Sequence, residues 1–310
     1  AEDCLRTIGA FQGLGVEISR GKESVSIMGG GFHGLKESAD VIDLGNSGTG
    51  IRLLSGVLAG QEFFSVLTGD SSLRQRPMRR VVEPLRQMGA VIQGRRGGDH
   101  APLAILGRPL NGIRYDLPIL SAQVKSALLL AGLNATGKTT IHEQAKSRDH
   151  TERLLRYFGV EVEEQNLTVS VKGPVTLQGR EVQVPADISS AAFLMVAASA
   201  VKGSQVTLLE VGVNPTRTGV LEILLEMGAD IKAENPRELC GEPVADITVK
   251  SGPLRGAMIK GEKTLRALDE FPILCVAAAL ASGETIITDA KELRVKESDR
   301  ISVMVQELSK

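Results

Sequence analysis

The sequence predicts an α/β (α+β) fold of two similar domains, because one supersecondary unit recurs along the chain. A large apolar residue near a helix end is followed by Gly, then Ala or Val, then a branched residue two positions further on. The glycines of the four copies are Gly15, Gly89, Gly159 and Gly228. The spacings of 74, 70 and 69 residues exceed those of solenoid repeats and suit a compact unit. A second helix in each interval ends at Gly60, Gly137, Gly203 and Gly283, each followed by an alternating strand. We therefore predict repeated βαβαββ-type units with buried helices.

The domain boundary is predicted near Pro185. A strand ends there, and Asp187 or Ser189 would cap the helix that follows. This gives one domain over residues 1–184 and another over 185–310, joined by a short hinge that would form a ligand cleft. Two Ala-rich segments, 189–200 and 271–281, are apolar nearly all round and are predicted to be buried helices.

Bulk composition excludes several classes of function. The net charge is −1, aromatic residues make up 3% and Trp is absent, which argues against a nucleic-acid binder. The longest apolar runs are too short to span a membrane, and no signal peptide is visible. Three isolated cysteines and four scattered histidines indicate neither disulfides nor a metal site. We expect a cytoplasmic, monomeric protein without a metal site.

Two glycine motifs resemble nucleotide-binding loops but occur in the wrong context. Residues 132–139 match G-x-x-x-x-G-K-[ST], yet a helix over 121–133 precedes them and a strand over 139–142 follows. A phosphate loop follows a strand and opens a helix, so we expect no ATP site. Residues 29–34 match G-x-G-x-x-G without a helix to follow, and are predicted to be a flexible turn.

Polar clusters lie where the repeated units join. Residues 44–52 open an apolar helix, where small residues let an anion approach the helix N-terminus. Residues 73–80 hold four arginines, which suit carboxylate or phosphate. Residues 118–126 and 147–152 head two further helices and offer Ser, Gln and Arg donors. Helix caps and an exposed basic helix start would explain the same residues structurally.

Two acidic clusters near the end of the sequence are suited to proton transfer. Asp269 and Glu270 precede an apolar helix, and Glu297 lies between Lys296 and Arg300. Acids from separate junctions, beside cations, can supply acid and base next to an anion clamp. A solvated charge run explains 292–300 less well, because Val295 and Ile301 alternate with the charges as if one side were packed.

Together these segments resemble the 5-enolpyruvylshikimate-3-phosphate synthase family, the 3-phosphoshikimate 1-carboxyvinyltransferases, in its class II bacterial form. The resemblance rests on residues 44–49, 76–78, 121–123, 148–152, 269–272 and 294–300, in family order. It implies the two-domain enolpyruvyl transferase fold. It also implies transfer of the enolpyruvyl group of phosphoenolpyruvate to the 5-hydroxyl of shikimate 3-phosphate, with release of phosphate and no cofactor.

The resemblance also assigns site residues. Asp269 would shuttle the hydroxyl proton and Glu297 the carbon proton. Shikimate 3-phosphate would be held by Ser121, Ala122, Gln123, Arg148, Asp269 and Lys296, although Ala122 replaces a second Ser of other branches. Phosphoenolpyruvate would be held by Asn46, Gly48, Arg76, Gln123, Glu297 and Arg300. Gly48 stands where sensitivity to the inhibitor glyphosate is set.

The sequence departs from the family pattern at both ends. The family's Lys-Ser-x-Ser-x-Arg motif and its final Arg and Lys contacts do not occur in it, so we expect a fragment truncated at both ends that is weakly active or inactive alone. A UDP-N-acetylglucosamine enolpyruvyl transferase would carry a loop Cys, which residues 71–80 lack. The sequence also leaves open an inactive binding or scaffold domain of the same fold and an RNA 3′-phosphate cyclase.

Overall fold

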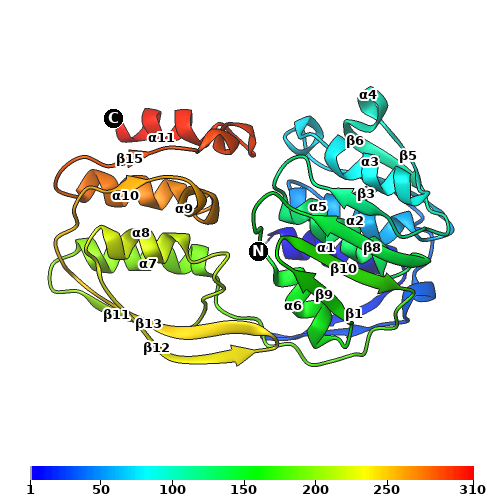
Figure 1. The fold of residues 1–310 in the computed structure, drawn as a ribbon, viewed down its shortest axis with the longest axis horizontal. Helices are drawn as coiled ribbons and strands as arrows, with labels where there is room; N and C mark the ends of the chain where they lie inside the picture. Colours follow the sequence, from blue (N-terminus) through cyan, green and yellow to red (C-terminus); the bar gives the residue numbers. More distant parts are fainter. Residues whose placement is uncertain (1) are drawn as a thin grey trace. The chain divides into compact units, whose positions relative to one another are not determined.

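The computed structural model describes residues 2–310, which fold into two compact units (Figure 1). The first unit ends at Arg180 and the second runs from Glu181 to Lys310. The sequence placed this boundary four residues later, after residue 184. Each unit has its own apolar core.

The first unit contains the predicted repeat twice, each time as a four-stranded sheet with two helices. The first copy comprises β3 (Ile42–Asp43), α2 (Gly48–Ala59), β4 (Phe64–Thr68), α3 (Arg79–Met88), β5 (Val91–Gly94) and β6 (His100–Leu106). The second comprises β7 (Arg114–Asp116), α5 (Ala122–Gly132), β8 (Gly137–His142), α6 (His150–Tyr157), β9 (Val162–Gln165) and β10 (Thr168–Gly173). The sheet orders, β3-β4-β6-β5 and β7-β8-β10-β9, are equivalent. In both, the first strand pair is parallel and the others are antiparallel, which confirms the βαβαββ unit.

Helices α2 and α5 form the centre of the first unit. Each is apolar over most of its surface and is capped by a serine: Ser47 accepts a hydrogen bond from the Gly50 amide, and Ser121 from the Val124 amide. Such caps satisfy amides that the helix leaves unpaired. The two helices approach closely at Gly56, where a Cβ would lie 2.1 Å from the carbonyl oxygen of Ala127. Their N-termini are thereby placed near each other.

Further elements complete the first unit. They are α1 (Glu2–Gly13), the hairpin of β1 (Glu17–Arg20) and β2 (Val25–Met28), the 3₁₀ turns η1 (Phe32–Gly34) and η2 (Leu73–Gln75), and α4 (Arg95–Gly98). The glycine segment 29–34 therefore ends in a single 3₁₀ turn, where the sequence predicted only a flexible turn. The other glycine motif joins the end of α5 to the start of β8, which is the reversed context that argues against an ATP site.

The second unit repeats the same order of elements. Its first copy comprises α7 (Ile188–Ala200), β11 (Gln205–Gly212), α8 (Gly219–Glu226), β12 (Asp230–Leu239) and β13 (Glu242–Lys250), and its sheet has the antiparallel order β11-β13-β12. A parallel bridge from Ala186 to Val211 stands where the first strand of the unit is expected. The following elements are β14 (Met258–Ile259), α9 (Glu262–Arg266), α10 (Phe271–Leu280), β15 (Ile286–Ile287), η3 (Lys291–Val295) and α11 (Arg300–Leu308).

The Ala-rich helices are not buried on all sides, so that prediction is wrong. Helix α7 buries Ala192 and Met195 but leaves Phe193 54% and Leu194 52% exposed. Helix α10 buries its first two turns and leaves Leu280 59% exposed. The physical reason is that α7 packs on its sheet and on α10 along one face, whereas the apolar composition extends around the whole helix. Within residues 2–310, no helix is both long enough and apolar enough to cross a membrane.

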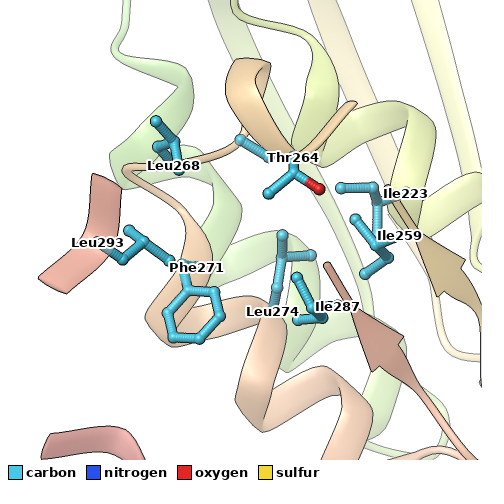
Figure 2. Close-up of a pocket in the computed structure, with 9 residues that line it drawn as sticks. Ile223, Ile259, Thr264, Leu268, Phe271, Leu274, Ile287 and Leu293 are labelled. Carbon is cyan, nitrogen blue, oxygen red and sulfur yellow. The ribbon is translucent and has the colours of Figure 1, made fainter. Parts of the chain in front are cut away.

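A small apolar cavity lies in the second unit between α9, α10 and β15 (Figure 2). Its lining includes Ile223, Ile259, Leu268, Phe271, Leu274 and Ile287. Thr264 contributes a hydroxyl that is buried and has no hydrogen-bond partner among the described residues. A buried hydroxyl without a partner loses its hydration and gains nothing in return.

Replacing this hydroxyl with a methyl group is expected to stabilise the second unit. Thr264→Val keeps the shape of the side chain and removes the unpaired hydroxyl, so the free energy of unfolding should rise by about 1 kcal/mol. Urea unfolding would measure the change. Thr207→Val is the matched control, because the Thr207 hydroxyl is exposed and bonded to Thr248. A Thr264→Val variant less stable than the parent would contradict the interpretation of the cavity.

Candidate active site

The start of α2 brings three of the predicted residues together. The Asn46 amide donates to Asp70 Oδ2 at 2.6 Å, and its carbonyl oxygen accepts a hydrogen bond from Arg76. A Cβ on Gly48 would lie 2.8 Å from Arg76 Nη1, so this guanidinium reaches directly over the backbone of the first helical turn. Glycine allows that approach, and the helix N-terminus favours an anion at the same place.

Arg52 links this helix start to Gln123, although it was not among the predicted site residues. Its Nη1 donates to Gln123 Oε1 at 2.6 Å and to the Gly48 carbonyl at 3.2 Å, and Nη2 donates to the Pro77 carbonyl at 3.2 Å. Gln123 in turn donates to Thr49 Oγ1 at 2.7 Å. The signal for Arg52 in the sequence is one cation inside an otherwise apolar helix, which needs buried partners.

The electrostatics of this cluster favour an anionic ligand. Burial lowers the pKa of Arg52 to about 10, and the neighbouring positive charges of Arg80 and Arg76 act in the same direction. Positive charges that lower the pKa of a neighbouring cation repel it, and an anion bound beside them offsets this repulsion. Arg52, Arg76 and Arg80 therefore form one cationic cluster beside Gln123.

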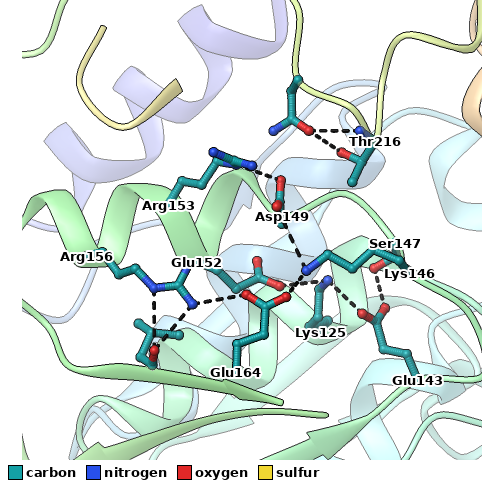
Figure 3. A network of polar contacts seen from close by, with 12 residues as sticks. Lys125, Glu143, Lys146, Ser147, Asp149, Glu152, Arg153, Arg156, Glu164 and Thr216 are labelled. Atoms are coloured by element: carbon teal, nitrogen blue, oxygen red, sulfur yellow. Dashed lines mark hydrogen bonds and ion pairs between the residues drawn. The ribbon is translucent and has the colours of Figure 1, made fainter. Parts of the chain in front are cut away.

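The starts of α5 and α6 carry the next predicted residues. Ser121 is the N-cap of α5, Ala122 is its first residue, and Gln123 points to Arg52. Arg148 lies two residues before α6 and is half-buried. Asp149, at the N-cap position of α6, accepts a hydrogen bond from Arg153 Nε at 3.0 Å. The two helix starts are joined by buried polar contacts, which Figure 3 shows.

The second unit brings the predicted acids and Arg300 together. Asp269 lies 3.4 Å from Arg300 Nη1, and the same guanidinium donates from Nε to Glu297 at 2.6 Å and from Nη1 to the Leu268 carbonyl at 2.9 Å. Lys296, half-buried, directly follows η3. The expectation that the side chain of Val295 is packed is wrong. Val295 is 56% exposed, and η3 instead buries Leu293.

Arg217 is a second residue that the sequence did not reveal. It is 8% exposed, and its guanidinium contacts Asp269 at 3.0 Å, Glu270 at 3.1 Å and the Ser189 hydroxyl. Asp187, the N-cap of α7, lies 3.8 Å away. Arg217 thus joins the segments that precede α7, α8 and α10. Its position at a unit junction, just before an apolar helix, is the signal that could have identified it.

The site residues thus form two sets, one in each unit. The first contains Asn46, Gly48, Arg76, Ser121, Ala122, Gln123 and Arg148, and the second contains Asp269, Lys296, Glu297 and Arg300. Among residues 2–310, no group of His, Cys, Asp and Glu side chains has a metal-binding arrangement. Both sets lie at helix starts and contain Arg or Lys side chains, a combination suited to phosphate and carboxylate groups.

The fold is that of the enolpyruvyl transferases. The enolpyruvyl transferase NikO from Streptomyces tendae superimposes with a TM-score of 0.68 over 89% of this chain and 64% of its own, at 16% sequence identity, a likeness of fold alone. The family model of EPSP synthase (3-phosphoshikimate 1-carboxyvinyltransferase) matches residues 1–310, and the chain belongs to this family.

Relatives support this assignment. The 3-phosphoshikimate 1-carboxyvinyltransferases of Geotalea daltonii and Geobacter sulfurreducens are each 57% identical to this chain, over 100% and 99% of it and 72% of their own length. The solved structure of EPSP synthase from Acinetobacter baumannii is 52% identical, with a TM-score of 0.89 over 100% of this chain and 70% of that one. The two-domain fold and the family predicted from the sequence are confirmed.

Proposed function

We propose that this chain transfers the enolpyruvyl group of phosphoenolpyruvate to the 5-hydroxyl of shikimate 3-phosphate and releases phosphate. The observation that carries the proposal is the 57% identity to 3-phosphoshikimate 1-carboxyvinyltransferases over essentially the whole chain. The cationic cluster of Arg52, Arg76 and Arg80 supports it, because both substrates are phosphorylated anions.

The reaction needs two proton transfers. In the addition step the 5-hydroxyl oxygen attacks the phosphate-bearing carbon of phosphoenolpyruvate, its proton passes to a base, and the methylene carbon takes a proton from an acid. In the elimination step the resulting methyl group gives up a proton and the phosphate leaves with the C–O bonding pair. We assign the hydroxyl proton to Asp269 and the carbon proton to Glu297. Their common contact with Arg300 supports placing both acids at one site, since it ties them to one cation.

We assign substrate binding to the residues that the resemblance to the family indicates. Shikimate 3-phosphate is held by Ser121, Gln123, Arg148 and Lys296, beside Ala122 and Asp269. Phosphoenolpyruvate is held by Asn46, Gly48, Arg76, Gln123, Glu297 and Arg300, and glyphosate competes for this place. Preorganised cations at a departing phosphate stabilise the negative charge that develops there, which accounts for the arginine content of both sets.

The assay that tests the function follows phosphate release from phosphoenolpyruvate. Release that depends on shikimate 3-phosphate is the expected result. Release that depends instead on UDP-N-acetylglucosamine would show that this compound is the acceptor and would overturn the assignment. Titration of each substrate by calorimetry completes the test, because a chain that binds neither substrate is a scaffold of the same fold.

Gly48→Ala is expected to weaken inhibition by glyphosate. The added methyl would lie 2.8 Å from Arg76 Nη1 and 3.0 Å from Arg52 Nη1, so both guanidinium groups must shift away from the anion that they hold. Such crowding costs about 1–3 kcal/mol, which corresponds to a rise in the inhibition constant of about 5- to 150-fold. Inhibition measured against varied phosphoenolpyruvate checks this. Gly34→Ala, where a Cβ meets no atom within 4 Å among the described residues, is the control, and an unchanged inhibition constant for Gly48→Ala would contradict the placement.

A further inference from the structure

Lys125 is a fully buried cation that none of the assigned roles uses. Its side chain is 0% exposed, and its ammonium lies 2.9 Å from Glu143 Oε2 and 2.7 Å from Glu152 Oε1. Both carboxylates are buried as well, and Figure 3 draws their contacts with the ammonium. Burying three ionisable groups costs several kcal/mol unless their geometry is good, so such a cluster is weak evidence for added stability. Its location suggests another role.

The cluster joins the elements that carry the residues assigned to shikimate 3-phosphate. Lys125 lies on α5, two residues after Gln123 and four after Ser121, and Glu152 lies on α6, four residues after Arg148. Glu143 directly follows β8 and accepts a hydrogen bond from the Ser147 hydroxyl, just before Arg148. The ammonium therefore holds both ends of the segment that presents Arg148 and ties them to the first turn of α5.

A second contact links the same two helices. The hydroxyl groups of Ser126 and Thr151 lie 2.7 Å apart, so consecutive residues of α5 bond to consecutive residues of α6. Two adjacent links between two helices define both their separation and their relative rotation. Bidentate or paired recognition of a phosphate group depends on such separations being held to a fraction of an ångström.

The link to α6 depends on an acceptor oxygen at Glu152 Oε1, which lies 2.7 Å from the Lys125 ammonium. Burial raises the pKa of Glu152, and the nearby Lys125 only partly offsets this. Glu152 Oε2 has no hydrogen-bond partner among the residues that the structure describes. A Gln amide in place of Glu152 keeps an acceptor oxygen at the Oε1 position, whereas an apolar side chain does not.

We propose that Lys125 is a positioning residue, which holds Arg148 at a set distance from Ser121 and Gln123 through its contacts with Glu143 and Glu152. The inference rests on the proposed function, since it concerns the place assigned to shikimate 3-phosphate. This role can be distinguished from a purely structural role of the ion cluster. Loss of a positioning residue changes the binding of one substrate and the hydrogen exchange of one segment, whereas loss of a structural residue changes only stability.

Glu152→Met is the decisive variant. It breaks the link to α6 and leaves Lys125 paired with Glu143, so no uncompensated charge is created. The expected result is a rise of at least about tenfold in the dissociation constant and KM for shikimate 3-phosphate, with a change below about twofold in KM for phosphoenolpyruvate. Glu152→Gln, which retains the acceptor, should restore the affinity. Lys138→Met, which removes the exposed Lys138–Glu163 pair of the same sheet, should leave both constants unchanged.

Hydrogen exchange gives a measurement independent of substrate. In Glu152→Met the amides of residues 148–153 should exchange faster, while those of β8 and β10 keep the parent rates. If the Glu152→Met variant does not fold, a triple variant that combines Lys125→Met, Glu143→Gln and Glu152→Met removes the three buried charges of this cluster. The same substrate constants and exchange rates are then expected to change.

The outcomes separate the two proposals. Failure of the parent chain to bind shikimate 3-phosphate would overturn the proposed function, and hydrogen exchange would then decide the positioning role alone. A parent that binds the substrate, together with a folded variant of equal affinity and unchanged exchange over 148–153, would overturn the positioning role. A uniform loss of stability without a difference between the substrates would do the same.

Discussion

Asp269→Asn is expected to reduce turnover by roughly 10²- to 10⁴-fold, the usual contribution of a positioned acid or base. The amide has nearly the size of the carboxylate but cannot take the hydroxyl proton. It also removes the negative charge that Arg217 contacts at 3.0 Å and Arg300 at 3.4 Å. Phosphate release from phosphoenolpyruvate, measured with saturating shikimate 3-phosphate, would show the loss in kcat.

The loss must be separated from a loss of structure. Asp230→Asn is the matched control, because Asp230 is exposed at the start of β12 and should retain the parent rate. Thermal unfolding of both variants should give midpoints close to that of the parent. An Asp269→Asn variant that keeps more than about a tenth of the parent kcat would contradict the assignment of Asp269 as the base.

Gly56→Ala is expected to destabilise the first unit by about 3 kcal/mol, the upper end of the usual cost of overpacking. The added Cβ would lie 2.1 Å from the Ala127 carbonyl oxygen and within 3 Å of two further backbone atoms of that residue. Neither backbone can rotate away as a side chain would, so α2 and α5 must separate along their whole contact. Urea unfolding would measure the loss in the free energy of unfolding.

The same substitution in an uncrowded helix is the control. Gly9 is exposed on α1, and a Cβ there meets no atom within 4 Å among the described residues. Gly9→Ala should therefore raise the free energy of unfolding by about 0.5–1 kcal/mol, the intrinsic helix preference of Ala over Gly. Equal effects at the two positions would show that the crossing of α2 and α5 tolerates a methyl group.

The crossing matters for function because both helices begin in the candidate site. Gly48 is the first residue of α2 and Gln123 the second of α5, and Arg52 bonds to both at 3.2 and 2.6 Å. A separation of the helices would lengthen these contacts. We therefore expect any Gly56→Ala protein that remains folded to bind phosphoenolpyruvate less tightly than the parent.

The sequence by itself determined the repeat, the order of strands and helices and the family. Those features depend on local chemistry: glycines end helices, alternating residues form strands, and small or charged residues gather where units join. The reversed context of residues 132–139 was visible for the same reason. Local pattern also misled, since the apolar surface of α7 indicated complete burial and Phe193 is 54% exposed.

Only the tertiary structure decided which side chains hold the site together. Arg52 meets Gln123 across 71 positions of sequence, and Arg217 meets Asp269 across 52. Gly56 has no room for a side chain because the backbone of α5 lies against it. The buried Lys125 is paired with Glu143, which follows β8, and with Glu152, which lies on α6. A residue's own neighbours in sequence do not encode such contacts, because partner distances follow from how the helices pack.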